Sequence, residues 1–296
     1  MENNFRINLL QNKAKIFFEL TKVKITSFVT VTTGFGYIAA TGIIDFQIVP
    51  VLLGVLFLAF GSATLNHFQE ESFDSKMDRT KSRPIPSGRI SPANVFIISF
   101  LLILSGSLVL YIWTNLLALG LGILNLFWYN LIYTYLKRKS AFAIVPGSLV
   151  GAIPPAIGWV AAGGYILDPQ IIVISFFFFI WQIPHFWLLL LVLDKDYKQA
   201  GFPTLTEIFS RVQLSRITFI WICATAVTGL MIPLFGIVTD SWINLTLFSS
   251  GVVLTWKAFG LLANTNDFSV FNHNFRYINY FALTVVFLVS IDKLIY

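Results

Sequence analysis

Four side chains with oxygen donors recur every four residues in one polar segment and could hold a metal ion. These residues are Asn66, Glu70, Asp74 and Asp78. Each step of four along an α-helix advances the direction by about 40°, so we expect the first three to share one stripe of a helix. Amide and carboxylate oxygens suit a hard cation such as Mg²⁺, which usually completes its shell with water and substrate phosphates. The spacing therefore predicts a magnesium site.

Basic residues follow these acids and could bind the phosphates. They are Arg79, Lys81, Arg83 and Arg89, and an arginine can hold two oxygens at once. The alternative is a solvated helix end with alternating charges, as in many water-soluble proteins. Here the acids adjoin an apolar segment long enough to span a bilayer, where ionisable groups are costly and usually functional. We therefore favour the functional interpretation.

A second polar group closes a later apolar run. His185 follows Pro184, and the run ends with Asp194, Asp196 and Tyr197. Asp196 lies 11 residues after His185, a net rotation of about 20° on an ideal helix, so we expect these two to share a face. Asp194 would point the opposite way. The two acidic segments together could place divalent ions around one diphosphate.

The histidines have different expected roles. His185 either packs against a neighbouring helix, hydrogen-bonded to it, or takes part in the site as a ligand or proton carrier. His67 points about 100° away from the adjacent Asn66 on a helix, and we interpret it as a packing residue. His273 lies in the polar stretch NHNFR, and we expect it in a solvated loop.

The composition is that of an integral membrane protein. Of 296 residues, 56% are hydrophobic and 11% are charged, and the mean hydropathy is +0.78. A soluble domain carries about a quarter charged residues. The net charge of +6 does not indicate a nucleic-acid partner, because the basic residues lie in the connections between apolar runs. The single cysteine, Cys223, excludes a disulfide framework and a cysteine metal site.

Windows of about 20 apolar residues predict an all-α bundle of nine transmembrane helices in one domain, 1–296. The expected spans are 25–44, 49–69, 94–113, 115–135, 142–163, 170–193, 215–237, 242–263 and 275–295. The segment 1–20 forms an N-terminal arm. Of the 20 Lys and Arg residues, 19 fall on one side of this arrangement and only Lys293 falls on the other. This asymmetry places the N-terminus and both acidic segments in the cytoplasm.

The motifs of this chain resemble those of the UbiA superfamily of intramembrane prenyltransferases, and especially of the members that farnesylate haem b. The resemblance is carried by N-x3-E-x3-D at 66–74, RT at 79–80 and RP at 83–84. The stretches WQIPHF at 181–186 and DYKQAG at 196–201 are typical of the haem-farnesylating members. The matching motifs lie in the same order, over about residues 15–292.

The resemblance implies a reaction and a set of site residues. A farnesyl group would pass from farnesyl diphosphate to a vinyl group of haem b with addition of water, giving haem O and diphosphate. Mg²⁺ would be the cofactor, with candidate ligands Asn66, Glu70, Asp74, Asp78, Asp194 and Asp196. The candidate diphosphate-binding residues are Lys22, Arg79, Arg83, Lys137 and Arg138. Candidate contacts to haem are His185 and Tyr197, and the catalytic set is Asn66, Glu70, Asp74, His185 and Asp196.

The expected surroundings follow from this chemistry. A farnesyl cation must be kept from water, and Phe68, Trp181 and Phe186 flank the polar segments closely enough to contribute. Both substrates would be bound within membrane lipid, and a haem A synthase that accepts the apolar product is a candidate partner. An N-terminus without an Arg- and Ser-rich presequence favours a bacterial inner membrane, with the active site facing the cytoplasm.

Two other functions are compatible with part of the sequence. A related enzyme that prenylates a quinone precursor or chlorophyllide is disfavoured by the WQIPHF and DY motifs. An ion transporter would place its acids near the bilayer midplane, on broken helices in paired halves. The acids of this chain stand at the ends of the spans instead.

Overall fold

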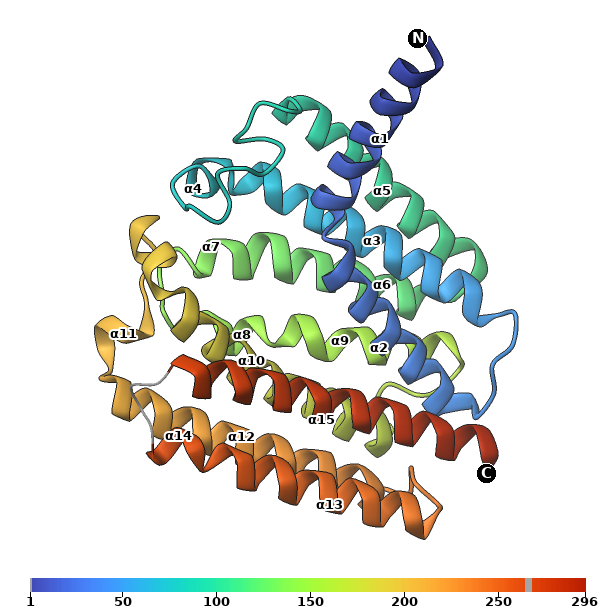
Figure 1. Ribbon diagram of the computed structural model, residues 1–296. Helices are drawn as coiled ribbons and strands as arrows, with labels where there is room; N and C mark the ends of the chain where they lie inside the picture. The colour runs from blue at the N-terminus through green and yellow to red at the C-terminus, as the bar shows by residue number, and fades with distance from the viewer. Residues whose placement is uncertain (1, 264–267) are drawn as a thin grey trace.

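The computed structural model describes residues 2–263 and 268–296, with side chains for 11–263 and 269–296. Within these residues the secondary structure is entirely helical, and the long helices run side by side (Figure 1). The first half contains α1 (Glu2–Thr21), α2 (Val23–Thr41), α3 (Ile48–Gln69), α4 (Glu71–Asp74) and α5 (Pro92–Trp113). The chain continues through α6 (Leu116–Phe127), the π-helix η1 (Trp128–Tyr133), α7 (Thr134–Leu136), α8 (Ile144–Gly147) and α9 (Leu149–Ala161). The second half contains α10 (Pro169–Gln199), α11 (Leu205–Ile208), α12 (Arg211–Leu234), α13 (Ser241–Ala258), α14 (Gly260–Ala263) and α15 (Phe268–Ile295).

Eight helical segments in the described part of the chain are long and apolar enough to cross a bilayer. The prediction of an all-α integral membrane protein is therefore confirmed. The remaining expected span, 25–44, corresponds to α2, a 19-residue helix rich in threonine that packs against α9 and α3. Because α2 is not among the eight, the count of nine spans stays a prediction.

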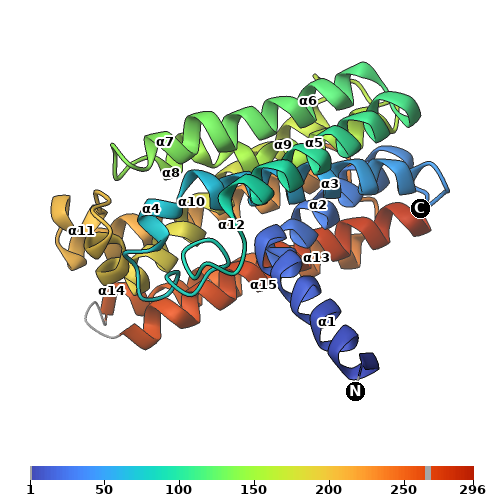
Figure 2. The ribbon, with the colours of Figure 1, turned by 90° about the horizontal axis from the view of Figure 1, so that it is seen from above.

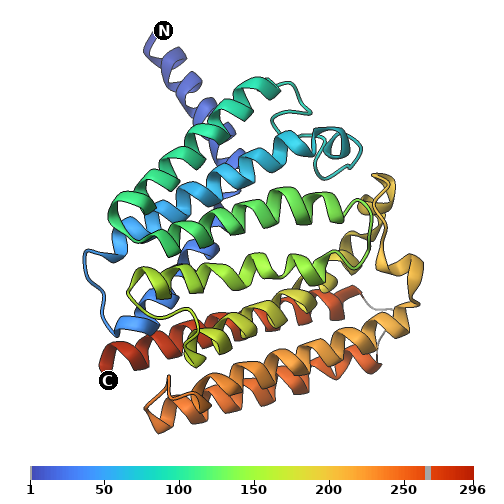
Figure 3. The same cartoon turned by 180° about the vertical axis from the view of Figure 1, so that it is seen from behind.

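Both acidic segments lie at the same end of the bundle. There α3, α7 and α10 finish and α12 and α15 begin, and this end, at the left of Figure 1, is termed the site end. The short helices α4 and α11 lie beside it, whereas the C-terminus lies at the opposite end. Helix α1 projects away from the other helices (Figure 2). Seen from behind, α5, α3, α6 and α9 lie next to one another (Figure 3).

Capping side chains define several helix starts. The Ser91 hydroxyl accepts from the Asn94 N–H before Pro92, and the Asn115 side chain accepts from the Ala118 N–H. Such caps satisfy N–H groups that have no partner within the helix, and proline is favoured in the first turn. Thr114 and Asn115 alone therefore suffice to separate α5 from α6.

The first acidic segment does not continue as one helix, so the expected single stripe is wrong. Helix α3 ends at Gln69, Glu70 has φ −109° and ψ 8°, and the four-residue α4 follows. The chain then turns, and the Thr80 hydroxyl donates to the backbone oxygen of Asp74 at 2.8 Å. Serine and aspartate compete for backbone hydrogen bonds and weaken a helix that has no apolar face to bury.

Two later helices are longer than expected. Helix α10 continues through Pro184 to Gln199, six residues beyond the predicted end of its span. Helix α15 begins at Phe268, so the interpretation of His273 as a loop residue is wrong: it is an exposed residue of the first turns of α15. Residues 264–267 of the expected loop lie outside the described residues. Both helices extend past their apolar parts because polar residues remain compatible with helix outside the apolar core.

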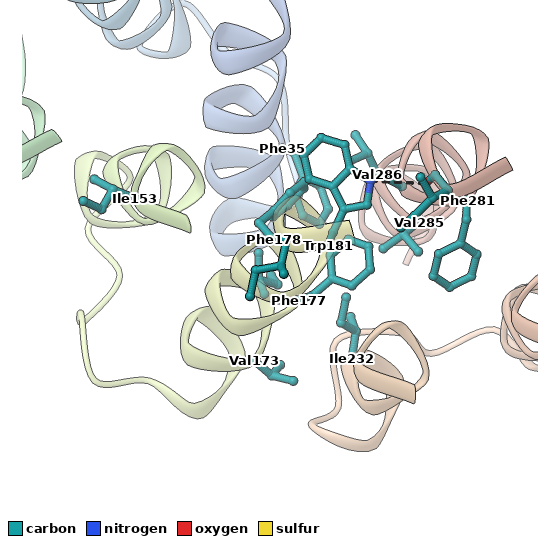
Figure 4. Close-up of a cluster of buried hydrophobic side chains, with 14 of the residues drawn as sticks. Phe35, Ile153, Val173, Phe177, Phe178, Trp181, Ile232, Phe281, Val285 and Val286 are labelled. Atoms are coloured by element: carbon teal, nitrogen blue, oxygen red, sulfur yellow. Dashed lines mark hydrogen bonds between the residues drawn. The ribbon is translucent and has the colours of Figure 1, made fainter. Parts of the chain in front are cut away.

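An aromatic cluster joins α2, α10 and α15 on the side facing the bundle interior (Figure 4). The Phe35 and Phe178 rings are 6.1 Å apart, and those of Phe177 and Phe281 are also 6.1 Å apart. The indole N–H of Trp181 donates to the Ile278 carbonyl at 3.2 Å. These contacts fix α10 against both neighbours and so set the position of the second acidic segment.

Glycines allow α2 and α9 to touch through their backbones. A Cβ added to Gly158 would lie 1.9 Å from the Thr33 carbonyl oxygen, and one added to Gly36 would lie 1.9 Å from that of Pro155. Small residues permit such close contact between membrane helices, where dispersion forces provide much of the stability.

We predict that Gly158→Ala lowers the free energy of unfolding by about 1–3 kcal/mol, because the new methyl group forces α2 and α9 apart. The midpoint of thermal unfolding in detergent measures this. Gly120→Ala is the matched control, since a Cβ there meets nothing within 4 Å. Equal midpoints for the two variants would contradict the close contact.

Candidate active site

Lys22 lies at the break between α1 and α2 and binds the first of the predicted oxygen ligands. Its backbone is left-handed, with φ 48°, and no other described non-glycine residue has a positive φ. Its Nζ donates to Asn66 Oδ1 at 2.7 Å. Burial, together with the charge of Arg83, lowers the pKa of the Lys22 ammonium to about 7. Strained backbone is retained where the surroundings demand it, often at functional sites.

Asp74 is held by a basic residue from the following loop. The Arg83 guanidinium donates from Nη1 to both carboxylate oxygens of Asp74, each at 2.7 Å. The Asp74 side chain is only 1% exposed, so its charge is compensated inside the protein. The loop after α4 therefore folds back onto the end of α4.

Glu70 forms an ion pair with Lys137, the residue that follows α7. The Lys137 ammonium also lies 5.6 Å from the ring centre of Tyr133 and 5.7 Å from that of Phe202. Burial alone would raise the pKa of Glu70, but the charges of Lys137 and Lys22 outweigh it, and the pKa is lowered. Glu70 is therefore an ionised carboxylate at neutral pH, as a metal ligand must be.

Arg138 closes the end of α3. It donates to the Gln69 carbonyl at 2.7 Å, and its guanidinium lies 4.8 Å from the ring centres of Phe73 and Tyr135. These contacts satisfy one of the carbonyl groups that a helix end leaves without a partner. The predicted contact with diphosphate stays a prediction for this residue.

The two acidic segments meet at the site end. Arg79 Nε lies 3.8 Å from Asp196 Oδ2, which links the first loop to the end of α10. Next to this pair, Phe73 packs on Phe202, with ring centres 4.8 Å apart, and Tyr197 packs on the other side of Phe202 at 5.6 Å. Segments more than 100 residues apart in sequence thus border one region.

Two predicted metal ligands lie outside the buried pairs. The Asp78 side chain is 68% exposed and pairs with Lys81 at 2.6 Å. Asp194 pairs with Lys198 at 2.9 Å and accepts a hydrogen bond from Thr206. The end of α4 at Asp74 explains the position of Asp78, because the residues from 75 to 78 are not helical and do not bring this side chain beside Asp74.

His185 contacts α15, and not Asp196 as its position on the helix suggested. Its Nδ1 lies 2.7 Å from Asn279 Oδ1, and its ring centre lies 4.8 Å from those of Trp181 and Phe275. The predicted shared face is compatible with an unbroken α10, but 11 residues of helix place the two side chains about 16 Å apart along the axis. No direct pairing is possible over that distance.

Sequence reasoning missed several polar residues inside the spans. Thr134 accepts from the Asn66 amide at 3.3 Å, and Asn130 binds Ser62 and Gln69 from an adjacent helix. Asn279 is the partner of His185. The only signal was an isolated polar residue in an apolar run, and nothing in the sequence indicates which other helix it faces.

A small cavity of about 40 Å³ adjoins these residues between α8, α10, α11 and α12. Tyr133 and Lys137 line it on one side, and Phe186, Trp187 and Leu191 line it on another. The indole N–H of Trp187 has no hydrogen-bond partner among the described residues. The cavity is mostly apolar, and its charged lining residues are Lys137, the partner of Glu70, and Asp194.

The donor set fits Mg²⁺. Asn66, Glu70 and Asp74 supply hard oxygens, and each faces a positive side chain whose charge a bound cation would replace. In the described part of the chain, no three His, Cys, Asp or Glu side chains converge on a metal-sized space. The acids present at the site end therefore need a further oxygen source, such as the amide of Asn66 or a phosphate of the substrate.

We predict that Arg83→Met lowers the free energy of unfolding by about 3 kcal/mol, because it leaves the Asp74 charge buried without a partner. Thermal unfolding in detergent measures the change. Lys81→Met is the matched control, since it removes only an exposed pair with Asp78, for which we expect no measurable change. A midpoint for Arg83→Met as high as that of Lys81→Met would contradict the assigned pairing.

The sequence and the fold were compared with known proteins. The sequence pattern of the UbiA prenyltransferase family matches residues 27–279. A protoheme IX farnesyltransferase from Geobacter sulfurreducens is 40% identical over 186 residues, which cover 63% of this chain and 68% of the relative. The solved structure described as that of a digeranylgeranylglyceryl phosphate synthase has a TM-score of 0.78 at 15% identity, covering 96% of this chain and 99% of the other. A UbiA homolog from Archaeoglobus fulgidus, solved with GPP and Mg²⁺ bound, has a TM-score of 0.63 at 14% identity, with coverage of 93% and 99%.

Proposed function

Because the chain belongs to the UbiA prenyltransferase family, we propose that it transfers a farnesyl group from farnesyl diphosphate to a vinyl group of haem b. Water adds in the same reaction, and the products are haem O and diphosphate. The name of the Geobacter relative supports the choice of substrates. The observation that carries the chemistry is the set of three buried oxygen side chains, each facing a base, where α3 meets α7.

Mg²⁺ is the proposed cofactor, and Asn66, Glu70 and Asp74 are the residues that would hold it. When bound, the ion would neutralise diphosphate oxygens and stabilise the charge that develops on the leaving group. Asp196 is the candidate for a second ion, because Arg79 already links it to the first loop. Asp78 and Asp194 remain candidates that would first have to leave Lys81 and Lys198.

The basic residues have a proposed role in binding the diphosphate. Lys22, Arg83 and Lys137 balance the oxygen ligands in this structure, and their charges become available to phosphate oxygens once a cation takes over those ligands. Preorganised positive groups at a leaving group are usually the largest single contribution to catalysis. Arg79 and Arg138 flank the same region and complete the proposed set.

The proposed farnesyl transfer breaks one C–O bond and forms one C–C bond and one new C–O bond. The C–O bond of farnesyl diphosphate breaks and its electron pair leaves with the diphosphate. The π electrons of the haem vinyl group form the new C–C bond, water adds to the neighbouring carbon, and a proton is lost. The aromatic side chains of Trp181 and Phe186 would exclude other water and stabilise the cation.

His185 and Tyr197 are the proposed contacts for haem. His185 is held by Asn279 through one ring nitrogen and lies between two aromatic rings, an environment suited to a flat apolar ligand. Its second nitrogen could bind iron or handle the proton of the added water. Tyr197 lies near the second acidic segment, packed on Phe202.

We propose that the protein resides in a bacterial cytoplasmic membrane with its site end toward the cytoplasm. The support for this orientation is the concentration of Lys and Arg residues in the connections at that end. The product remains apolar and must pass to another membrane enzyme, so a haem A synthase is a proposed partner.

We predict that purified protein converts haem b and farnesyl diphosphate to haem O in the presence of Mg²⁺, detected by mass spectrometry, and that EDTA stops the reaction. Asp74→Asn should reduce turnover by about 100-fold or more, because it removes a charge from the proposed metal site. The matched control is Asp78→Asn, which changes an exposed carboxylate four residues away. Haem O formation by Asp74→Asn at the rate of Asp78→Asn would defeat the metal assignment. Formation of a different prenylated product would defeat the proposed acceptor.

We predict that His185→Ala weakens haem binding by about tenfold, measured by titration of the Soret absorption band, because it removes a polar contact inside an aromatic site. His273→Ala provides a control on an exposed face of α15. An unchanged spectrum together with unchanged turnover in His185→Ala would leave this residue with a packing role alone.

A further inference from the structure

Two rows of polar side chains with the same spacing join α3 to the neighbouring helix formed by α6, η1 and α7. The first row consists of Ser62, Asn66 and Gln69 of α3 and the following Glu70. The second row consists of Asn130 in η1, Thr134 in α7, and Lys137 and Arg138 directly after α7. Both rows have the sequence spacing i, i+4, i+7, i+8. Both helices run toward the site end, so equivalent positions lie side by side.

The deepest part of this contact is centred on Asn130, which is fully buried. Its Oδ1 accepts from the Ser62 hydroxyl at 2.6 Å, and its Nδ2 donates to the Ser62 carbonyl at 3.0 Å. The same Nδ2 donates to Gln69 Oε1 at 3.0 Å, and Gln69 Nε2 donates back to the Asn130 carbonyl at 3.1 Å. One asparagine thus binds two turns of α3.

The contacts nearer the site end involve the proposed ligands themselves. Asn66 donates to Thr134, Glu70 pairs with Lys137, and Arg138 donates to the Gln69 carbonyl. Asn66 lies three residues before Gln69, and Glu70 directly follows it at the end of α3. Any rotation or sliding of α3 that breaks the Asn130 contacts therefore also moves both proposed metal ligands.

Asn130 lies within the π-helix η1. Six residues, Trp128–Tyr133, have the wider π geometry, and the Thr134 hydroxyl donates to the Tyr129 carbonyl at 2.8 Å, five residues back. A π segment turns the residues after it relative to a regular helix, and such segments are frequent at functional sites. The second row therefore begins in a local departure from α-helix.

Because their surroundings are apolar, these hydrogen bonds favour a single register of α3 against the neighbouring helix. A shift of α3 by one residue rotates its stripe by about 100° and would leave the amide groups of Asn130 and Gln69 without partners. An unpaired buried amide is costly, and more so where water cannot enter. Apolar packing alone would tolerate such a shift more readily.

We propose that Asn130 is a positioning residue that sets the register of α3 against α7, and through it the places of Asn66 and Glu70. This inference rests on the proposed role of those two residues in binding Mg²⁺ and diphosphate. Asn130 itself touches neither reacting group. Its effect is transmitted through Ser62 and Gln69.

The test is the binding of farnesyl diphosphate by the full-length protein in detergent, titrated calorimetrically at a series of Mg²⁺ concentrations. Asn130→Ala should raise the Mg²⁺ concentration for half-maximal binding by about 10- to 100-fold, the usual effect of removing a group that holds metal ligands in place. Asn125→Ala is the matched control: it removes an asparagine from the same helix whose Oδ1 has no hydrogen-bond partner. We expect that variant to bind as the wild type does.

A double-mutant cycle separates positioning from a general loss of structure. If Asn130 acts through Glu70, Asn130→Ala should have little further effect in a Glu70→Gln background, and the two changes should not add. Should Asn130→Ala fail to fold, Ser62→Ala replaces it, since this removes the hydroxyl donor to Asn130 and leaves both Gln69 contacts in place. A smaller shift in the same direction is then expected.

Several results would overturn the inference. They are Mg²⁺ dependence in Asn130→Ala within twofold of the wild type, an equal change in Asn125→Ala, or fully additive effects with Glu70→Gln. Wild-type protein that binds farnesyl diphosphate with Mg²⁺ but makes no haem O would instead count against the proposed reaction, and would leave the role of Asn130 standing.

Discussion

The site end depends on one constraint: each charge buried there must have a partner. Asp74 is buried against Arg83, Glu70 against Lys137, and Lys22 against Asn66. Removing one partner leaves an uncompensated charge, which costs far more than the pair contributes. The arrangement is therefore stable without a ligand, yet it consists of oxygens and cations that a metal ion and a diphosphate can separate. In the proposed function, binding of Mg²⁺ and diphosphate would exchange these partners without exposing any charge.

The apolar helices supply the rigid frame that these pairs need. Backbone contact at Gly36 and Gly158 joins α2 to α9, and the aromatic cluster around Trp181 joins α10 to α2 and α15. The site residues themselves stand where helices end or change geometry, at Lys22, Glu70 and Lys137. Such positions point side chains across the bundle, whereas the middle of a straight helix keeps them on one stripe.

The sequence was sufficient for the fold class and for most of the residues that meet at the site end. Long apolar runs predict membrane helices without knowledge of the helices they pack against. Acidic and basic residues beside such runs are usually functional, because they are costly there. The pairing of His185 could not be predicted, because helix periodicity gives a direction and says nothing about the axial distance or the opposite helix. The helix break at Glu70 was missed for a similar reason: a spacing of four is equally compatible with a helix and with two short turns.

The contacts of Asn130 with α3 could not be predicted from the sequence. A π turn leaves no composition signal, and one asparagine in an apolar run reads as a tolerated exception. Its importance comes from a second helix, 68 residues away in sequence, that carries the same spacing of polar groups. In water such a row would be a weak constraint, because solvent can replace every partner. Inside a membrane no water replaces a lost hydrogen-bond partner. A few hydrogen bonds can therefore hold two helices in the one alignment that brings the proposed ligands together.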